Sequence, residues 1–216
     1  SYTTTVWSFH TMFRDRDELY RQFVDSSTEI AMNLANANPD PYCDQMVRDT
    51  MNSEYYPAGY GANQQTVLLT AFLSTYMSRD KNSFSPFMKM PMPNWSINYN
   101  GLSKIEFLKK WFTNIAISHK YSSTYTVGNF YTDAAISAFT DGYDYGTESV
   151  TNGNGDYIPP VSMDGVMLSE QFNPLIMLNV NMVNSFNFKL SIQKNRNQAL
   201  SFTNNQLTET YRDGIT

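Results

Sequence analysis

Alternation of apolar and polar residues predicts several long β-strands along this chain. The clearest run covers 176–192, where every even position except Asn184 is apolar, and the odd positions from Asn179 onward are polar apart from Val183. A period of two is typical of a strand with one apolar and one polar face. Similar alternation predicts further strands at 2–13, 95–100, 111–131 and 198–210, with a turn at 194–197.

Residues 14–90 follow a different period and predict a mostly helical insert. Between 17 and 36, the residues Leu19, Phe23, Ile30 and Leu34 recur at spacings of four and seven, which is the apolar stripe of an amphipathic helix. The prolines at 39 and 41 end this helix, and a short helix is expected to follow as far as Met46. A second long helix is predicted over 64–79.

The predicted strands are long enough to suggest a membrane. Two of them reach about 17–20 residues, whereas strands in soluble sheets average about five or six. Trp111 and Tyr121 are separated by roughly 33 Å of strand at about 3.3 Å per residue. At a tilt near 40°, this distance projects to roughly 25 Å, the height of the apolar band of a transmembrane barrel.

We therefore predict a mainly β fold, a segment of a transmembrane antiparallel β-barrel with a helical insert between strands. About eight strands is the smallest usual number for closure, so we expect these five to be one piece of a larger barrel. Long connections of such barrels lie outside the cell, which places strands one, three and five running outward. The expected units are a barrel strand at 1–13, a mostly helical extracellular insert at 14–90, and barrel strands at 91–216 with a long acidic extracellular loop at 132–173.

The period of two also divides the strand residues between lipid and lumen. Those predicted to face lipid are Trp95, Ile97, Tyr99, Trp111, Ile115, Ile117, Tyr121, Ile176, Leu178, Val180, Met182, Phe186, Phe188, Leu190 and Ile192. Those predicted to face the lumen are Asn98, Asn114, Ser118, Asn179, Asn181, Ser185, Asn187, Lys189 and Ser191.

Composition narrows the possible functions. The net charge of −5 argues against a nucleic-acid partner. The charged fraction of 16% lies below the roughly 25% of soluble domains, and aromatic residues reach 15%. A single cysteine excludes an internal disulfide framework.

No catalytic, cofactor or metal site is predicted, and we expect no enzyme activity. His10 and His119 lie on predicted strands without catalytic or metal-ligand spacing around them, and we interpret His119 as an interfacial or packing side chain. The loop at 132–173 contains seven acidic and no basic residues. Ca²⁺ prefers several oxygen ligands, and the loop could bind it through Asp141, Asp144 and Glu148. The spacing of these residues instead favours a solvated loop.

Several sequence blocks carry a family resemblance. They are Ala71-Phe-Leu-Ser-Thr-Tyr76, Ser85-Pro-Phe-Met-Lys-Met-Pro-Met-Pro-Asn-Trp95, Tyr99-Asn-Gly-Leu-Ser-Lys104, His119-Lys-Tyr-Ser-Ser-Thr124, Phe172-Asn-Pro-Leu-Ile176, the run from Arg196 to Phe202, and Gln206-Leu-Thr-Glu209. Together these blocks resemble the C-terminal part of the SprA/Sov family, the outer-membrane translocons of the type IX secretion system. The first 60 residues and the loop at 132–173 are less similar.

The resemblance implies a parent barrel of about 36 strands, the upper end of known barrels. Such a barrel carries folded cargo proteins across the cell outer membrane, and the family is also linked to gliding motility. The implied partners are the rest of the parent barrel, a PorV-type shuttle barrel, a periplasmic plug protein, secreted cargo and outer-membrane lipid. No cofactor is implied. The insert and the acidic loop would then be placed to cover the pore or to receive the shuttle.

Two other functions fit parts of the same pattern. A TonB-dependent-type outer-membrane transporter barrel would have similar strands but a smaller number of them. A soluble glycan-binding β-module would turn the apolar stripes toward the core of a sandwich.

Overall fold

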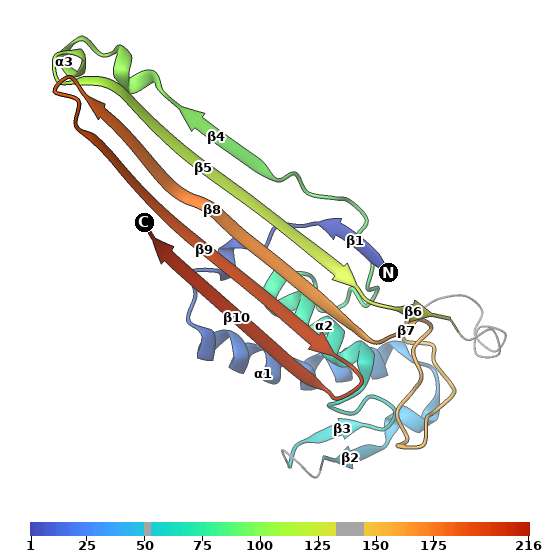
Figure 1. Ribbon diagram of the computed structural model, residues 1–216. Coiled ribbons are helices and arrows are strands. Elements are labelled where there is room, and N and C mark those ends of the chain that lie inside the picture. The colour runs from blue at the N-terminus through green and yellow to red at the C-terminus, as the bar shows by residue number, and fades with distance from the viewer. Residues whose placement is uncertain (50–52, 133–144) are drawn as a thin grey trace.

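The computed structural model describes residues 1–49, 53–132 and 145–216 of the chain. The fold is mainly β, and its centre is one long antiparallel sheet of six strands. Two helices lie across one face of the sheet and cover only one half of its length (Figure 1). The other half projects beyond the helices and ends at a short helix (Figure 1).

The elements follow one another with these bounds: β1 (Tyr2–Thr5), η1 (Phe9–Thr11), α1 (Arg16–Ala37), η2 (Pro41–Asp44), β2 (Met46–Arg48), β3 (Tyr55–Pro57), α2 (Gln65–Met77), β4 (Trp95–Tyr99), η3 (Gly101–Lys104), α3 (Glu106–Lys109), β5 (Phe112–Val127), β6 (Phe130–Tyr131), β7 (Ser162–Met163), β8 (Gly165–Met182), β9 (Asn187–Ser201) and β10 (Gln206–Ile215). The large sheet has the order β1-β5-β8-β9-β10, with β4 also paired to β5, and β2-β3 and β6-β7 are small separate pairs.

One edge of the sheet is made by two segments that are far apart in the sequence. β1 pairs with the end of β5, where Tyr2 lies opposite Val127, and β4 pairs further along the same strand, where Trp95 lies opposite Tyr121. Both run antiparallel to β5. The prediction that strands one and two run in opposite directions is therefore wrong. β1 and β4 follow one another along the same edge of the sheet, and the helical insert separates them in the sequence.

The strand predicted at 2–13 is also too long. β1 ends at Thr5, and the chain then turns through η1. The reason is packing, because Met12 is buried against Tyr121 and Phe172 of the sheet, with Phe9 beside them. A chain that continued as an extended edge strand could not place these side chains over the sheet.

The run at 176–192 is not one strand but a hairpin. β8 ends at Met182, and β9 begins at Asn187 and pairs with it, with Asn181 opposite Asn187. The turn between them contains Ser185 at φ 65°, and the Asn184 side chain accepts a hydrogen bond from the Phe186 N–H at 3.1 Å. Asn184, the one break in the apolar period, therefore marks the reversal.

The strand boundaries on either side of this hairpin differ from the predictions as well. β8 begins at Gly165, so the last part of the predicted loop at 132–173 is strand. Residues 194–197, predicted as a turn, lie within β9, and the turn comes at 202–205 before β10. The physical reason is a pair of buried charges, Glu170 and Arg196, which lie opposite each other at even positions of β8 and β9.

The helical predictions agree closely with α1 and α2. The Asp15 carboxylate caps α1 by accepting a hydrogen bond from the Glu18 N–H at 3.0 Å. The Gln64 side chain caps α2 in the same way at Val67, also at 3.0 Å. α2 is buried at almost every position, because it lies between α1 and the sheet. In the described ranges, no helix is long and apolar enough to cross a membrane.

Candidate functional site

The two faces of the large sheet are chemically different. We call the face that carries Ile117, Leu178 and Leu190 the belt face, and the face that carries Ser118, Asn179 and Lys189 the polar face. The registers between β4, β5, β8 and β9 place the strand residues predicted to meet lipid together on the belt face. They place the predicted lumenal strand residues together on the polar face. The register thus groups these residues by face, and the assignment to lipid or lumen stays a prediction.

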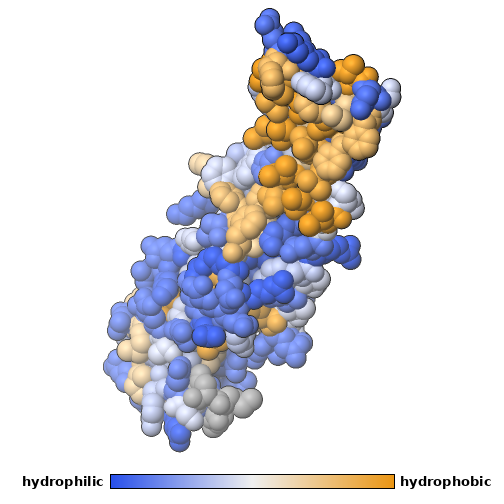
Figure 2. Space-filling model, turned by 90° about the vertical axis from the view of Figure 1, so that its left-hand side faces the viewer, coloured by the Kyte–Doolittle hydropathy of each residue, from blue (hydrophilic) through white to orange (hydrophobic). Residues whose placement is uncertain are grey.

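The belt face is exposed in the half of the sheet that ends at α3. Its large apolar side chains there include Ile97, Tyr99, Ile176 and Phe188, which are 46–56% exposed. Figure 2 shows hydrophobic side chains gathered in this half of the molecule and hydrophilic ones in the other half. We call this set of belt-face residues, with the less exposed Trp95, Ile117, Leu178, Val180, Met182, Leu190 and Ile192, the apolar belt. Trp111, just before β5, and Phe186, in the β8–β9 turn, are also exposed at the end near α3 but lie outside the paired strands.

Two residues predicted to face lipid are buried within the chain. Tyr121 is fully buried, because its ring stacks on Trp95 at 4.4 Å and packs edge-on against Phe9 of η1 at 5.5 Å. Ile115 is only 7% exposed. The prediction of lipid contact is wrong for Tyr121, which marks the place where η1 begins to cover the belt face.

The polar face has its own exceptions. Ser185 lies in the β8–β9 turn rather than on a strand. Ser191 is 5% exposed, and its backbone exchanges two hydrogen bonds with Thr216 at 2.7 and 2.9 Å. The remaining predicted lumenal residues lie at strand positions and are exposed or half-buried.

His119 lies on the belt face, half-buried between rings. Its Nδ1 is 2.6 Å from the Leu175 carbonyl oxygen, and its ring packs on Phe172 at 5.5 Å. These contacts agree with the interpretation of His119 as a packing residue.

A buried polar cluster lies at the end of the apolar belt, where the helices begin to cover the sheet. Arg196 of β9 and Glu170 of β8 form an ion pair, and both side chains are fully buried. The Arg196 Nε donates to Glu170 Oε2 at 2.8 Å, and its Nη2 donates to the Thr11 hydroxyl at 2.5 Å. The guanidinium also lies 6.0 Å from the ring of Tyr76 in α2.

The other carboxylate oxygen, Glu170 Oε1, accepts hydrogen bonds from residues on the opposite side of the cluster. The Tyr121 hydroxyl donates to Glu170 Oε1 at 3.1 Å, and the Ser8 hydroxyl donates to the same atom. Ser8 also donates its N–H to the Tyr121 hydroxyl at 3.2 Å. The cluster therefore ties η1 and α2 to the sheet, and it separates the exposed belt from the helix-covered core.

Of the three acidic residues considered around Ca²⁺, Glu148 is the one that the structure describes. Asp141 and Asp144 lie outside the described residues. Glu148 is 1% exposed, and its Oε2 accepts hydrogen bonds from the Tyr60 hydroxyl and the Gly146 N–H, both at 2.7 Å. Among the residues that the structure describes, no group of three His, Cys, Asp or Glu could hold a metal ion. Glu148 is thus a buried anchor for its segment.

Burial raises the pKa of the Glu148 carboxyl above its usual value of 4.5. At a pH above 4.5 but below the raised pKa, the Glu148 carboxyl keeps its proton in the native chain and has released it in the unfolded chain. The free energy of unfolding therefore falls as pH rises through this window. We expect Glu148→Gln to reduce this loss in unfolding measurements between about pH 4 and 8. The exposed Asp25→Asn is the matched control. Equal pH slopes for wild type and Glu148→Gln would contradict the prediction.

Comparison with protein-family models gives no match, and comparison with curated proteins gives none either. The resemblance to the SprA/Sov family therefore stays a prediction from the sequence.

Proposed function

We propose that this chain forms part of the wall of an outer-membrane protein-conducting channel of the type IX secretion system. The observation that carries the proposal is the apolar belt, a broad hydrophobic surface (Figure 2). It lies on one face of a long sheet whose other face carries polar residues. Soluble monomers rarely expose contiguous apolar patches larger than a few hundred Å². In the wall of a barrel, lipid would cover such a belt.

The dimensions and edges of the sheet support the same proposal. The belt runs from the α3 end of the sheet to Trp95, which lies opposite the buried Tyr121, and this span corresponds to the roughly 25 Å apolar band of a tilted barrel wall. The outer edges of β4 and β10 pair with no further strand in the described residues. Unpaired backbone groups cost several kcal/mol each in lipid, so further strands of the same barrel would flank both edges.

In this proposal the polar face lines the aqueous pore, and the β8–β9 turn and α3 lie at the periplasmic end. α1 and α2 cover the belt face beyond the belt, so they would stand outside the wall and above the membrane surface. This position differs from a roof over the pore or a plug within it. It suits a docking site for the implied PorV-type shuttle, which approaches from the side.

The two alternatives predict different behaviour of the full-length protein. A soluble glycan-binding module would not require the belt to meet lipid. A TonB-dependent-type transporter would share the belt but would carry nutrients rather than secreted proteins.

Depletion of the full-length protein in its own cells tests the proposal. We expect the protein in the outer-membrane fraction, soluble only in detergent, and we expect cargo proteins to accumulate in the periplasm on depletion. Recovery of the protein from the periplasm without detergent would contradict the proposal. Normal secretion with impaired nutrient uptake would favour the TonB-dependent alternative.

A further inference from the structure

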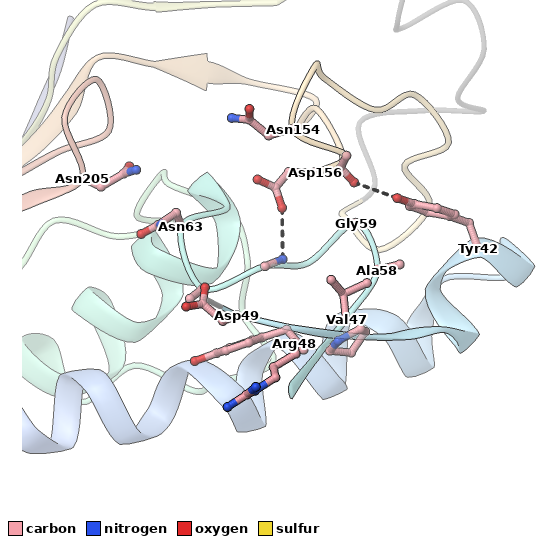
Figure 3. Close-up of a pocket in the computed structure, with 15 residues that line it drawn as sticks. Tyr42, Val47, Arg48, Asp49, Ala58, Gly59, Asn63, Asn154, Asp156 and Asn205 are labelled. Carbon is pink, nitrogen blue, oxygen red and sulfur yellow. Dashed lines mark hydrogen bonds between the residues drawn. The ribbon is translucent and has the colours of Figure 1, made fainter. Parts of the chain in front are cut away.

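A polar groove lies at the end of the sheet opposite α3, away from the apolar belt. Two adjoining pockets of about 380 and 460 Å³ share four lining side chains, Asn63, Asn154, Asp156 and Asn205. These residues come from the loop before α2, the segment before β7 and the β9–β10 turn. Figure 3 shows the four side chains around the same space, with Asp49 on its floor.

Hydrogen bonds hold the walls of this groove in place. Asp156 Oδ1 accepts a hydrogen bond from the Gly61 N–H at 3.2 Å, which joins the two loops (Figure 3). Asn152 Oδ1 accepts from the N–H groups of Asn154 and Asp156 at 2.8 and 3.1 Å. The Tyr42 hydroxyl donates to the Gly155 carbonyl at 3.3 Å. The groove is thus formed before any ligand arrives, which lowers the cost of binding.

The lining matches a ligand that both donates and accepts hydrogen bonds. In the described part of the chain, no hydrogen bond uses the side-chain amides of Asn63, Asn154 or Asn205. Each amide offers two donors and one acceptor, and Asp156 adds a carboxylate acceptor. Aromatic surface is close by, since Tyr42 lines one pocket and Tyr131, which is 63% exposed, lines the other.

The charges around the groove argue against the other common ligands. Among the described residues that line the two pockets, Arg48 is the only basic one, whereas Asp49, Asp156 and Asp164 are acidic, so a phosphate or a polyanion would be repelled. The amide-rich walls also offer little to an apolar molecule. A sugar ring suits this lining, because its vicinal hydroxyl groups can hydrogen-bond the amides and its apolar C–H faces can pack against the aromatic rings.

We propose that this groove binds a neutral oligosaccharide. The four shared side chains would hydrogen-bond the sugar hydroxyls, and Tyr42 and Tyr131 would pack against the ring faces. The proposal goes beyond the channel function and does not depend on it, because the groove lies on the loops rather than on the belt. If the channel proposal also holds, the groove opens on the outer side of the membrane.

Calorimetric titration of the full-length protein in detergent tests this proposal. The probes are maltohexaose, mannohexaose and chitohexaose, without added metal. We expect at least one of them to bind with a dissociation constant in the millimolar range or tighter. We expect Asn63→Ala with Asn154→Ala to weaken that binding by at least about tenfold, since two direct hydrogen-bonding groups are lost.

The matched control is Asn36→Ala, an exposed asparagine on α1 outside the groove, which should bind as wild type does. The melting temperature of the double variant shows whether it has folded. If the double variant fails to fold, Asn154→Gln alone serves, with at least a threefold loss expected. Absence of binding by all three probes, or unchanged binding by the folded groove variant, would overturn the proposal.

Discussion

Replacing Arg196 with alanine should destabilise the chain by about 3–5 kcal/mol, the usual cost of breaking a buried ion pair by removing one partner. The substitution leaves the Glu170 carboxylate buried without its cation, in a cluster where both side chains are fully excluded from solvent. It also removes the donor to the Thr11 hydroxyl. Chemical denaturation of the full chain would measure the loss, and hydrogen exchange should show η1 and α2 opening first.

Two further variants separate the charge effect from loss of packing. Replacing both partners, Arg196→Met with Glu170→Leu, should recover much of the stability, because a buried pair and a hydrophobic replacement of similar volume are often equivalent. Lys194→Ala is the matched control on the same strand and face, since Lys194 pairs with Asp213 at 3.2 Å in a half-exposed bridge. Its cost should stay within about 1 kcal/mol. Equal costs for Arg196→Ala and Lys194→Ala would contradict the importance of the cluster.

Phe188→Arg should destabilise the protein in a lipid bilayer by roughly 2–4 kcal/mol, the cost of an arginine near the midplane on the lipid face of a barrel. Phe188 lies on the apolar belt opposite Val180, in the second pair from the β8–β9 turn, and is 46% exposed. We expect a cost at the lower end of this range, because the penalty falls toward the membrane surface. In water the same exposed position would tolerate arginine well. The loss of stability caused by Phe188→Arg therefore shows whether the belt lies in lipid or in water.

The control for this prediction is Asn187→Arg, one residue away and on the polar face. It adds the same charge to the same strand, and we expect little change. Urea titrations of both variants in phosphatidylcholine vesicles provide the comparison. A small cost for Phe188→Arg together with a large cost for Asn187→Arg would mean that the assignment of the faces is reversed.

Alternation in the sequence predicted the two faces of the sheet but not the number of strands. Because Asn181 pairs with Asn187, even positions stay on one face when the chain reverses through 183–186. A period of two cannot detect such a reversal, so one long strand and a hairpin look the same. Asn184 was the only signal of the turn, and polar residues also occur singly within strands.

The opposite error arose at 194–197, where both parities of β9 are polar. Lys-Asn-Arg-Asn is typical of an exposed turn, and the pairing of Arg196 with Glu170 comes from a contact between strands that the local pattern does not contain. An acidic residue on the apolar parity of one strand, with a basic residue at the matching place of the next, is the signal that was available.

The local sequence pattern also did not show how the helical insert packs on the rest of the chain. Spacing and caps predicted α1 and α2, but an apolar stripe does not identify the surface that it meets. The sequence of α2 contains no charged residue, which indicates burial on all sides, and α2 does lie between α1 and the sheet. That the covered surface is the belt face could not be predicted, nor could the groove, which is assembled from three distant loops.

Spin labels on neighbouring residues of β9 test most directly whether the belt meets lipid. We expect nitroxides at Phe188→Cys and Leu190→Cys, in a Cys43→Ser background, to be accessible to oxygen and shielded from a nickel chelate in vesicles. Labels at Lys189→Cys and Asn187→Cys should show the reverse, because these positions lie on the polar face, which the channel proposal turns toward an aqueous pore. High nickel accessibility at Phe188 and Leu190, equal to that at Lys189, would contradict the membrane account.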